Sequence, residues 1–493
     1  MFITLFKRYL QVKHCHNGLV FSINGFNKIR SIGFITSISK FLTSSALITL
    51  IAFGATTINV ANADEPKDCT LPSNWFDNPN GNDIPDPAIL AWEINSQTKC
   101  QFHQWSWNAF LWAMQDMGDN LLRFETFPTM EETVNANWDP DAKREEIKLN
   151  LRVGKADHPI DSVAQAGTTG ILVAQNNYPV YYSQHINPQM FEDITERGWT
   201  TANGIASAPQ NSLFEIGDVE YKAAWAVVSS EDDIPGAYTR MASIPELTAT
   251  TIAGTYTIGV PKNPIYNTEL VALIGLHVVG WVNGHSEAVW ASFSPKEIAS
   301  IVGQTDADRD PSHVVTDTAG PFIAAGTTVA DCNQTQNPVQ RLNDDGQTLK
   351  LTTQVCQMFE NGDRLPQDQT NNNSVNQVNA SAAELVPSGL QASGYSEVGA
   401  VWSNKDDRNE WPLIQKEKLN VTFQNQLTGS TVLSNPVIET FTQTQVGADN
   451  CLTCHNSLQF QPSNPSIDPL KPSMLNLSHF LMQIYVDTAK GED

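Results

Sequence analysis

Two cysteines and a histidine lie close together near the end of the chain, in the run Cys451-Leu452-Thr453-Cys454-His455. Thiols separated by two residues can each add to one vinyl group of the same haem, and a histidine directly after them can bind its iron. With 7 cysteines and 10 histidines among 493 residues, chance would produce this pattern only ~0.002 times. The motif therefore predicts one covalently bound haem c, with His455 as the proximal iron ligand.

Three other chemistries use cysteines at this spacing. A thioredoxin-type dithiol requires a βαβ context, which the flanking Asn450 and Asn456 do not suggest. A zinc site could combine Cys451, Cys454 and His479, but no second closely spaced pair of ligands completes it. A disulfide within the motif would close a tight loop that is commoner in redox enzymes than in structural cross-links. Covalent haem is the interpretation that the sequence favours.

The sixth iron ligand decides what such a haem can do. Methionine raises the reduction potential and suits an electron carrier, histidine lowers it, and an open position admits small ligands. Met474 is the first candidate, because it follows Pro472-Ser473 in a loop that could fold over the haem. The alternatives are an open position or one of four other side chains, namely Met482, His479, His277 and His285. No catalytic residue is assigned.

The remaining histidines carry no ligand-like spacing. None of His103, His158, His185 and His313 has a second histidine three or four positions away. Such residues are most simply packed in a core or exposed on the surface. The chain also lacks a glycine-rich phosphate loop, so the sequence does not support a nucleotide cofactor.

The first 63 residues have the composition of a secretory signal. They contain six basic residues and no acidic one, and they end in an apolar run from Ala46 to Ala55 followed by Ala61-Asn62-Ala63. A basic region, a short apolar core and a small-x-small end predict cleavage after Ala63. Because bacteria attach haem covalently outside the cytoplasm, this signal predicts a periplasmic protein.

Removal of that segment makes an acidic chain more acidic. Its 29 basic residues fall to 23 against 53 acidic ones, so the net charge changes from −24 to about −30. Nucleic acid and anionic membrane surfaces would repel such a protein. The charge is compatible with docking to a basic redox protein, and equally with simple solubility.

Four further cysteines form two pairs that are close in sequence. Cys69 and Cys100 are one pair, and Cys332 and Cys356 are the other. In an exported chain, neighbouring cysteines favour local disulfides. Four cysteines permit three pairings, and the two local ones are the simplest expectation.

The body of the chain, residues 64–434, is predicted to be rich in β-structure. Helical patterns cover Ala88 to Gln97 and Phe102 to Met117, whereas runs of β-branched and aromatic residues favour strands. The expected strands are Ile171–Tyr182, Ile216–Val228, Glu269–Val282, Ala288–Phe293 and Val421–Leu427. The fold class is therefore α+β, with a large sandwich-like body and flanking helices. The Asn/Gln-rich tract from Pro366 to Asn379 is expected to be a surface loop.

The last segment, residues 435–493, is predicted to be helical around the motif. Asn435 and Pro436 are typical of a helix start, and Gly447 of a helix end. After the motif, apolar residues recur on one helical face, namely Leu477, Phe480, Leu481, Ile484 and Tyr485. Because only 38 residues follow His455, this segment is too short to enclose a haem, and the body must provide the other wall.

The order of helix, haem motif, loop and helix resembles small c-type cytochromes over about the last 60 residues. The whole chain is similar to large, single-haem, exported bacterial proteins of the cytochrome c family. That resemblance implies a haem and export but no particular reaction. We therefore expect an electron-transferring cytochrome. The alternatives are a haem-dependent oxidoreductase with a substrate pocket between body and haem segment, and a haem-based ligand-binding or sensor protein.

Overall fold

The computed structural model describes most of the chain after residue 67. The described ranges are 12–15, 18–21, 68–78, 80, 83–94, 98–142, 144, 147–149, 170–252, 255–261, 263–303, 305–335, 340–362, 369–403, 427–433, 435–443, 451–462 and 464–489. Most of the predicted leader and most of the Val421–Leu427 strand lie outside them. Among the described residues, no helix combines the length and apolar character needed to cross a bilayer.

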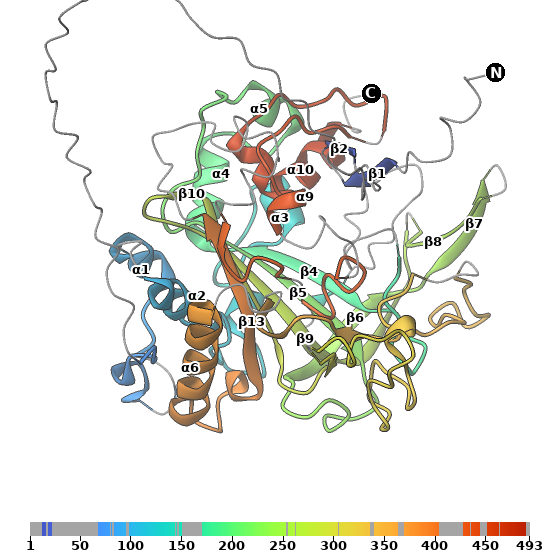
Figure 1. The fold of residues 1–493 in the computed structure, drawn as a ribbon. Helices are drawn as coiled ribbons and strands as arrows, with labels where there is room; N and C mark the ends of the chain where they lie inside the picture. Colours follow the sequence, from blue (N-terminus) through green and yellow to red (C-terminus); the bar gives the residue numbers. More distant parts are fainter. Residues whose placement is uncertain are drawn as a thin grey trace, which may run out of the picture.

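A single mixed sheet of eight strands forms the centre of the molecule (Figure 1). Its main path runs β14-β13-β10-β9-β5-β4, and β6, which pairs with β9, also pairs with β3. The bounds are β3 Ile147–Lys148, β4 Tyr181–Ile186, β5 Val219–Val227, β6 Thr239–Pro245, β9 Tyr266–Val282, β10 His285–Pro295, β13 Tyr395–Ser403 and β14 Leu427–Gly429. In the described ranges, three two-stranded pairs lie outside it, namely β1 Val12–Cys15 with β2 Gly18–Phe21, β7 Thr248–Ile252 with β8 Thr255–Gly259, and β11 Ser300–Ile301 with β12 Cys356–Gln357.

Helices and short 3-10 turns surround this sheet. The helices are α1 Pro87–Glu93, α2 Lys99–Ala113, α3 Met130–Val134, α4 Pro188–Glu196, α5 Ala202–Ser207, α6 Gln369–Leu385, α9 Cys451–Cys454 and α10 His479–Ala489. The 3-10 turns are η1 Ser73–Phe76, η2 Arg123–Thr126, η3 Val329–Asp331, η4 Glu360–Gly362, η5 Gln391–Gly394 and η6 Met474–Leu477.

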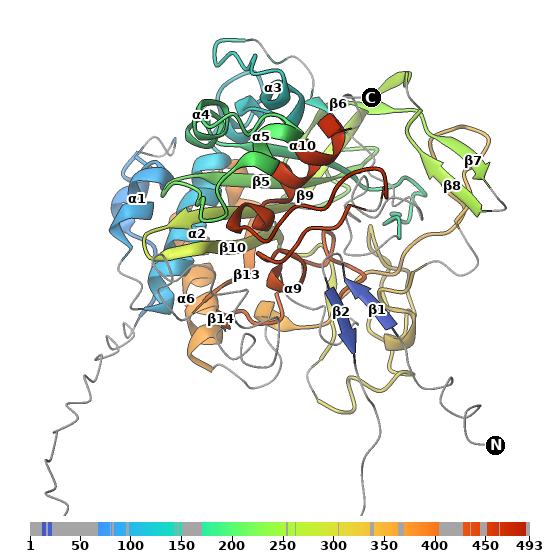
Figure 2. The same ribbon diagram turned by 90° about the horizontal axis from the view of Figure 1, so that it is seen from above.

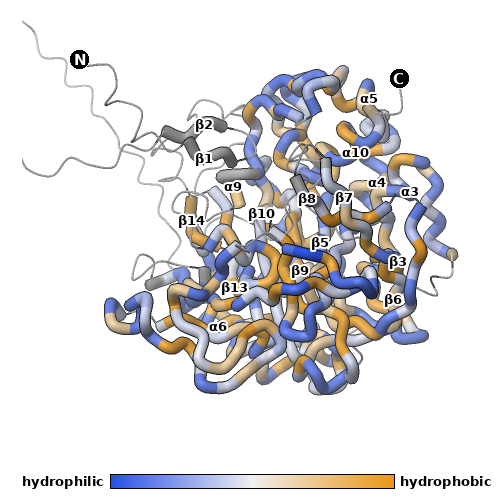
Figure 3. The backbone as a smooth tube through the Cα atoms, turned by 90° about the vertical axis from the view of Figure 1, so that its right-hand side faces the viewer, coloured by the Kyte–Doolittle hydropathy of each residue, from blue (hydrophilic) through white to orange (hydrophobic). Residues whose placement is uncertain are grey.

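Strand β9 is buried on both faces and shows how the layers are built. Its side chains alternate between the two faces of the sheet, as the two-residue period of a strand requires, and they join one apolar cluster on the α2 face and two on the other. Leu276 and Val278 belong to the cluster around α2, whereas Val279 and Trp281 belong to the cluster around α10. The hydropathy colouring shows this apolar interior along the central strands (Figure 3). The sheet therefore has α2 on one face and the C-terminal segment on the other.

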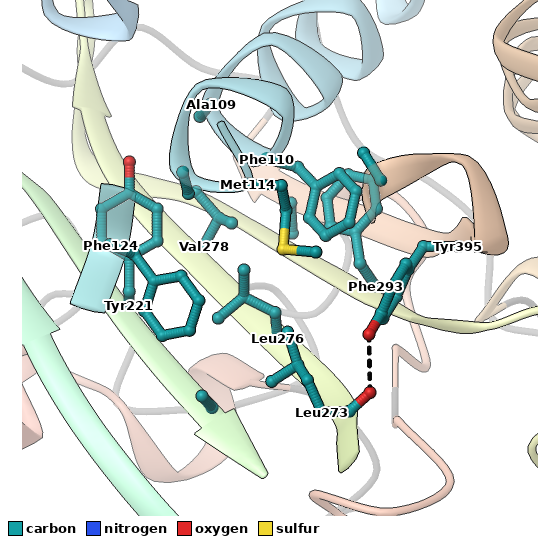
Figure 4. Packing of buried hydrophobic residues seen from close by; sticks show 14 of the residues in the cluster. Ala109, Phe110, Met114, Phe124, Tyr221, Leu273, Leu276, Val278, Phe293 and Tyr395 are labelled. Atoms are coloured by element: carbon teal, nitrogen blue, oxygen red, sulfur yellow. Dashed lines mark hydrogen bonds between the residues drawn. The ribbon is translucent and has the colours of Figure 1, made fainter. Parts of the chain in front are cut away.

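Helix α2 covers its face of the sheet with aromatic rings. Phe110 stacks on Phe293 of β10 with ring centroids 4.1 Å apart, and the Tyr395 hydroxyl donates to the Leu273 carbonyl at 2.7 Å (Figure 4). The predicted aromatic helix is thus a core helix. Helix α6 packs beside it, on the outer side of the same layer (Figure 1).

The other face is covered by the end of the chain, residues 451–489, which we call the tail. Helix α10 packs against α5 (Figure 2), and η6 contacts β10. Tail residues share one buried cluster with strand residues, among them Leu452, Leu481, Val279 and Trp290. The strand face of the body therefore packs against the tail.

Four sequence predictions need correction. The body is one sheet flanked by helices, so the sandwich-like expectation is wrong. Of the predicted strand Ile171–Tyr182, only its last two residues belong to β4. The tract from Pro366 to Asn379 enters helix α6 at Gln369, and strands β6 and β13 were not predicted. Asn435 does cap a turn, accepting from the amides of Val437 and Ile438, but the described residues 436–443 form turns only.

Both predicted disulfides are present. Cys69 is bonded to Cys100 at the start of α2, and Cys332 is bonded to Cys356 in β12. In each pair the Cα atoms are 5.5 Å apart, a normal spacing for a disulfide. The first bond fixes the start of the described body to α2.

Candidate functional site

The cysteine–histidine motif forms a short helix and a turn. Helix α9 holds both cysteines, and the His455 amide continues it by donating to the Cys451 carbonyl at 2.9 Å. His455 then contacts η6, because its Nδ1 lies 2.8 Å from the Leu477 carbonyl. Since a carbonyl can only accept, Nδ1 carries the proton and Nε2 carries the lone pair. This is the tautomer in which Nε2 can bind a metal.

Aromatic rings hold the His455 imidazole from two directions. The indole of Trp290 in β10 lies 4.4 Å from it between centroids, at 48°. The His479 ring stacks on it at 3.5 Å and 26°. Trp290 is itself fixed, because its Nε1 donates to the Glu287 carbonyl at 2.7 Å. The body thus positions the histidine of the motif through Trp290.

Asn476 braces the loop between the motif and η6. Its side-chain amide donates to the carbonyls of Leu458 and Lys471, at 2.7 and 3.1 Å. The Ser473 amide donates to the Ser457 carbonyl at 3.1 Å. With Asn476 only 1% exposed, these bonds hold η6 against the turn after His455. The Leu477 carbonyl is therefore held in place to orient the imidazole.

The environment of Cys451 keeps its thiol protonated. Desolvation raises the thiol pKa most, and the Glu439 carboxylate raises it further, while Lys222 opposes both. Cys451 forms no disulfide. A thioredoxin-type cysteine needs the opposite, a lowered pKa that yields a thiolate. The dithiol and disulfide alternatives therefore receive no support at Cys451; the Cys454 side chain lies outside the described residues.

The candidate distal ligands are found in different places. Met474 is 2% exposed and begins η6, whose last residue contacts the Nδ1 side of His455. His479 stacks face to face on His455, and a centroid separation of 3.5 Å leaves no room for a haem between the two rings. In this arrangement His479 cannot be the ligand on the opposite face. Met482 lies in the same buried cluster, and Met474 stays a prediction.

The two body histidines differ in their surroundings. His277 of β9 pairs with Glu439 at 3.0 Å, and this same carboxylate acts on Cys451, so His277 belongs to the neighbourhood of the motif. His285 instead faces α2, where its ring meets Phe102 edge-on at 4.9 Å and its Nδ1 contacts Glu287 at 2.7 Å. His285 is thus on the other face of the sheet from the tail.

A buried polar contact ties the tail to β5. The Ser478 hydroxyl donates to Glu220, and the same oxygen accepts from the Leu481 amide at 3.0 Å, which caps α10. Burial raises the pKa of Glu220 to about 7, although the Ser478 hydrogen bond opposes this rise. Sequence reasoning missed Glu220 and Trp290, which lie far from the motif in sequence, and gave Leu477 only a packing role, since it acts through its backbone.

Neither a metal-binding group nor a similar known protein adds to this site. Among the described residues, no group of three or more His, Cys, Asp or Glu side chains is arranged to hold a metal ion. Comparison with protein-family models, curated proteins and solved structures gives no match. The functional assignment therefore depends on the residues of this chain alone.

Proposed function

We propose that this protein is an exported c-type cytochrome that carries one covalent haem and transfers electrons. The observation that carries the proposal is the hydrogen bond from His455 Nδ1 to the Leu477 carbonyl, directly after the C-x-x-C motif. Metal-binding histidines typically donate their other ring nitrogen to a carbonyl in this way. The motif and the fixed imidazole fit the same group.

Cys451 and Cys454 would each hold the haem by one thioether. In each addition a sulfur–carbon bond forms and the thiol proton passes to the other vinyl carbon, so no oxidant is consumed. A protonated Cys451 thiol suits this addition. Bound haem supplies a one-electron couple at its iron, and Met474 is the proposed distal ligand that would set a high potential.

The body would act as the protein wall of the site. Trp290 and Leu452 bring apolar surface to the side of the motif that faces the sheet. Exclusion of water from one side favours a stable, low-spin haem over one that exchanges ligands freely. The acidic surface, with a net charge of about −30 after cleavage at Ala63, suits a basic redox protein as partner in the periplasm.

Expression together with a haem-attachment system tests the proposal. The wild-type protein should keep haem through a denaturing gel, and its oxidised spectrum should contain the weak near-infrared band of methionine ligation. The double variant Cys451→Ala/Cys454→Ala should lose the haem stain, whereas His313→Ala, at an exposed histidine, should keep it. Full haem retention in the double variant would reject the cytochrome proposal.

The distal ligand is tested separately. Met474→Ala should abolish the near-infrared band and yield a high-spin haem that binds carbon monoxide, whereas Met482→Ala should leave the band in place. A wild-type spectrum that is already high-spin would instead favour the haem-based sensor or oxidoreductase.

A further inference from the structure

One carboxyl group of the body is linked to the histidine of the motif through two consecutive residues of the tail. The Ser478 hydroxyl donates to Glu220 of β5, and the Leu477 carbonyl lies 2.8 Å from Nδ1 of His455. Since the Leu477 carbonyl and the Ser478 amide nitrogen belong to one peptide group, they move together as a rigid, planar unit. The contact with Glu220 therefore bears on the atom that orients the imidazole.

Ser478 is held from several sides. Its hydroxyl oxygen accepts from the Leu481 amide at 3.0 Å, and its carbonyl accepts from the Met482 amide at 3.1 Å, so it is fixed to the first turn of α10. Glu220 is equally well anchored, because β5 is hydrogen-bonded to β4 on one side and to β9 on the other. The contact between Ser478 and Glu220 thus ties the junction of η6 and α10 to the middle of the sheet.

Glu220 can change its charge close to neutral pH. Burial raises its pKa to about 7, and the hydrogen bond from Ser478 opposes this rise. The residue nevertheless keeps part of its surface exposed, so protons can reach it from the solvent. A carboxylate accepts a hydrogen bond more strongly than a neutral acid does. The protonation of Glu220 therefore alters both its contact with Ser478 and the charge beside the motif.

Other titratable groups lie around Glu220 and have to be separated from it. Strand β4 places the uncharged Ile186 opposite Glu220. In the described part of the chain, the charged or titratable groups that face this end of β5 are Asp218 and Lys222 beside it, His277 on β9 with Glu439, Asp193 on α4 and His479 on α10.

Asp218 is the group that most needs a control. Among the described residues, burial and the Ser478 hydrogen bond move the pKa of Glu220, and none of the neighbouring charges does. Asp218, however, also has a raised pKa of about 8, caused by burial and then by Asp193. Its carboxylate accepts from the Gln189 side chain at 3.1 Å and from the Glu215 amide at 3.0 Å. Asp218 is thus a carboxyl group near Glu220 that is held by the body and not by Ser478.

We propose that Glu220 is a positioning residue for His455, which fixes the Leu477 carbonyl through Ser478 and takes up one proton from the solvent when the haem iron is reduced. This inference rests on the proposed function. An electron added beside His455 makes the site more negative, and a nearby negative charge favours the neutral form of a carboxyl group. The step balances, because the redox partner protein supplies one electron, ferric iron becomes ferrous, and the solvent supplies one proton.

Redox titration of the full haem-loaded chain at several pH values tests the proton uptake. The midpoint potential of the wild-type protein should fall as pH rises through about 7, the pKa of Glu220, because reduction then has to bind a proton. Glu220→Gln keeps an acceptor for Ser478 but cannot titrate, so it should keep the haem spectrum and lose this fall. Asp218→Asn is the matched control and should retain most of it.

Ser478→Ala tests the connection to His455. Since the Ser478 hydrogen bond lowers the pKa of Glu220, its loss should move the fall in potential to higher pH. The same variant releases the Leu477 carbonyl and should speed the binding of carbon monoxide. A contact with a purely structural role would not move the pH at which the potential changes.

Infrared difference spectroscopy observes the proton directly. Reduction of the wild-type protein near pH 7 should increase the signal of protonated carboxyl groups, and this increase should persist in Asp218→Asn and be absent from Glu220→Gln. In the chain without haem, a pH titration of the same signal should find a group of Glu220 that titrates near pH 7.

The outcomes separate this inference from the cytochrome proposal. Failure to attach haem rejects the cytochrome, and the inference with it, whereas attached haem with a potential that does not depend on pH rejects the inference alone. The inference is also overturned if folded Glu220→Gln keeps the fall, or if Asp218→Asn alone removes it. If Glu220→Gln does not fold, the infrared measurement on Asp218→Asn decides, and no gain of protonated carboxyl on reduction overturns the inference.

Discussion

The two faces of the central sheet are covered in different ways. On one face α2 and α6 are fixed by the Cys69–Cys100 disulfide, by stacked rings and by buried hydrogen bonds such as His103 Nε2 with Asn371 at 2.9 Å. On the other, the tail is held mainly by apolar packing, with polar contacts to the body that include Ser478 with Glu220. Haem chemistry is proposed on the less cross-linked face, and that face depends on the body for its shape.

Separating the tail from the body should have the largest effect. A fragment of residues 435–493 loses the strand face of Val279, Trp281 and Trp290, and so most of its apolar partners. Loaded with haem, it should show an exposed haem, easy ligand exchange and no cooperative melting by circular dichroism. A fragment with a native-like spectrum and a sharp melt would show that the tail is an independent domain.

Removing the disulfide tests the opposite face. Cys69→Ser/Cys100→Ser opens a loop with a sequence separation of 31 and should lower the free energy of unfolding by roughly 3–4 kcal/mol. Because α2 and the tail lie on different faces, the haem spectrum should not change. Urea denaturation measures the loss, and a spectral shift in the folded variant would show that the two faces are coupled.

The pH dependence of stability should report the contact between tail and body. The folded pKa of Glu220, about 7, lies above the ordinary value near 4.5. The stability that the folded protein gains by holding this proton more tightly is therefore fully present below pH 4.5. It is lost as pH rises through 7, by up to about 3 kcal/mol. Glu220→Gln should remove much of this loss between pH 5 and 8.

Asp218 is the control for that measurement. Burial and Asp193 raise its pKa to about 8, so it produces a slope of the same sign that should persist in the Glu220→Gln variant. Urea denaturation at several pH values gives both slopes. Identical pH profiles for wild type and Glu220→Gln would contradict the assignment.

The smallest effects are expected from alanine variants of two buried asparagines, Asn476 and Asn371, one on each face of the sheet. Asn476→Ala leaves two carbonyls next to the motif without this donor, and Asn371→Ala removes the Oδ1 acceptor of His103 Nε2 on the other face. Each should cost about 1–3 kcal/mol. Only Asn476→Ala should also alter the haem spectrum or speed carbon monoxide binding, since it releases η6 and thereby His455.

Local patterns predicted the parts of the fold that depend on nearby residues. Helix α2, strands β5, β9 and β10 and both disulfides were predicted from periodicity and spacing, and the structure contains them. The strand predicted over Ile171 to Val180 is wrong because these apolar residues are buried in a loop, where Val173 and Pro179 form an isolated bridge. Burial was correctly indicated there, but not the strand.

Helix α6 shows what composition cannot reveal. Its sequence is rich in asparagine and glutamine, yet Asn379 binds the Glu397 backbone and Gln377 accepts from the Cys69 amide. Composition does not reveal such contacts, because a partner such as Cys69 lies 308 residues away from Gln377 in sequence.

The placement of the tail on the sheet has a consequence for how the chain folds as it emerges. Synthesis proceeds from the N-terminus, so β9 and β10 can pair as a local hairpin long before residue 451 appears. Until then the strand face of Val279, Trp281 and Trp290 has no cover, and exposed apolar strand surface is prone to aggregate. The tail is thus synthesised after the strands that it covers. A chain truncated before the motif should be lost to aggregation or proteolysis rather than accumulate as a stable protein without haem.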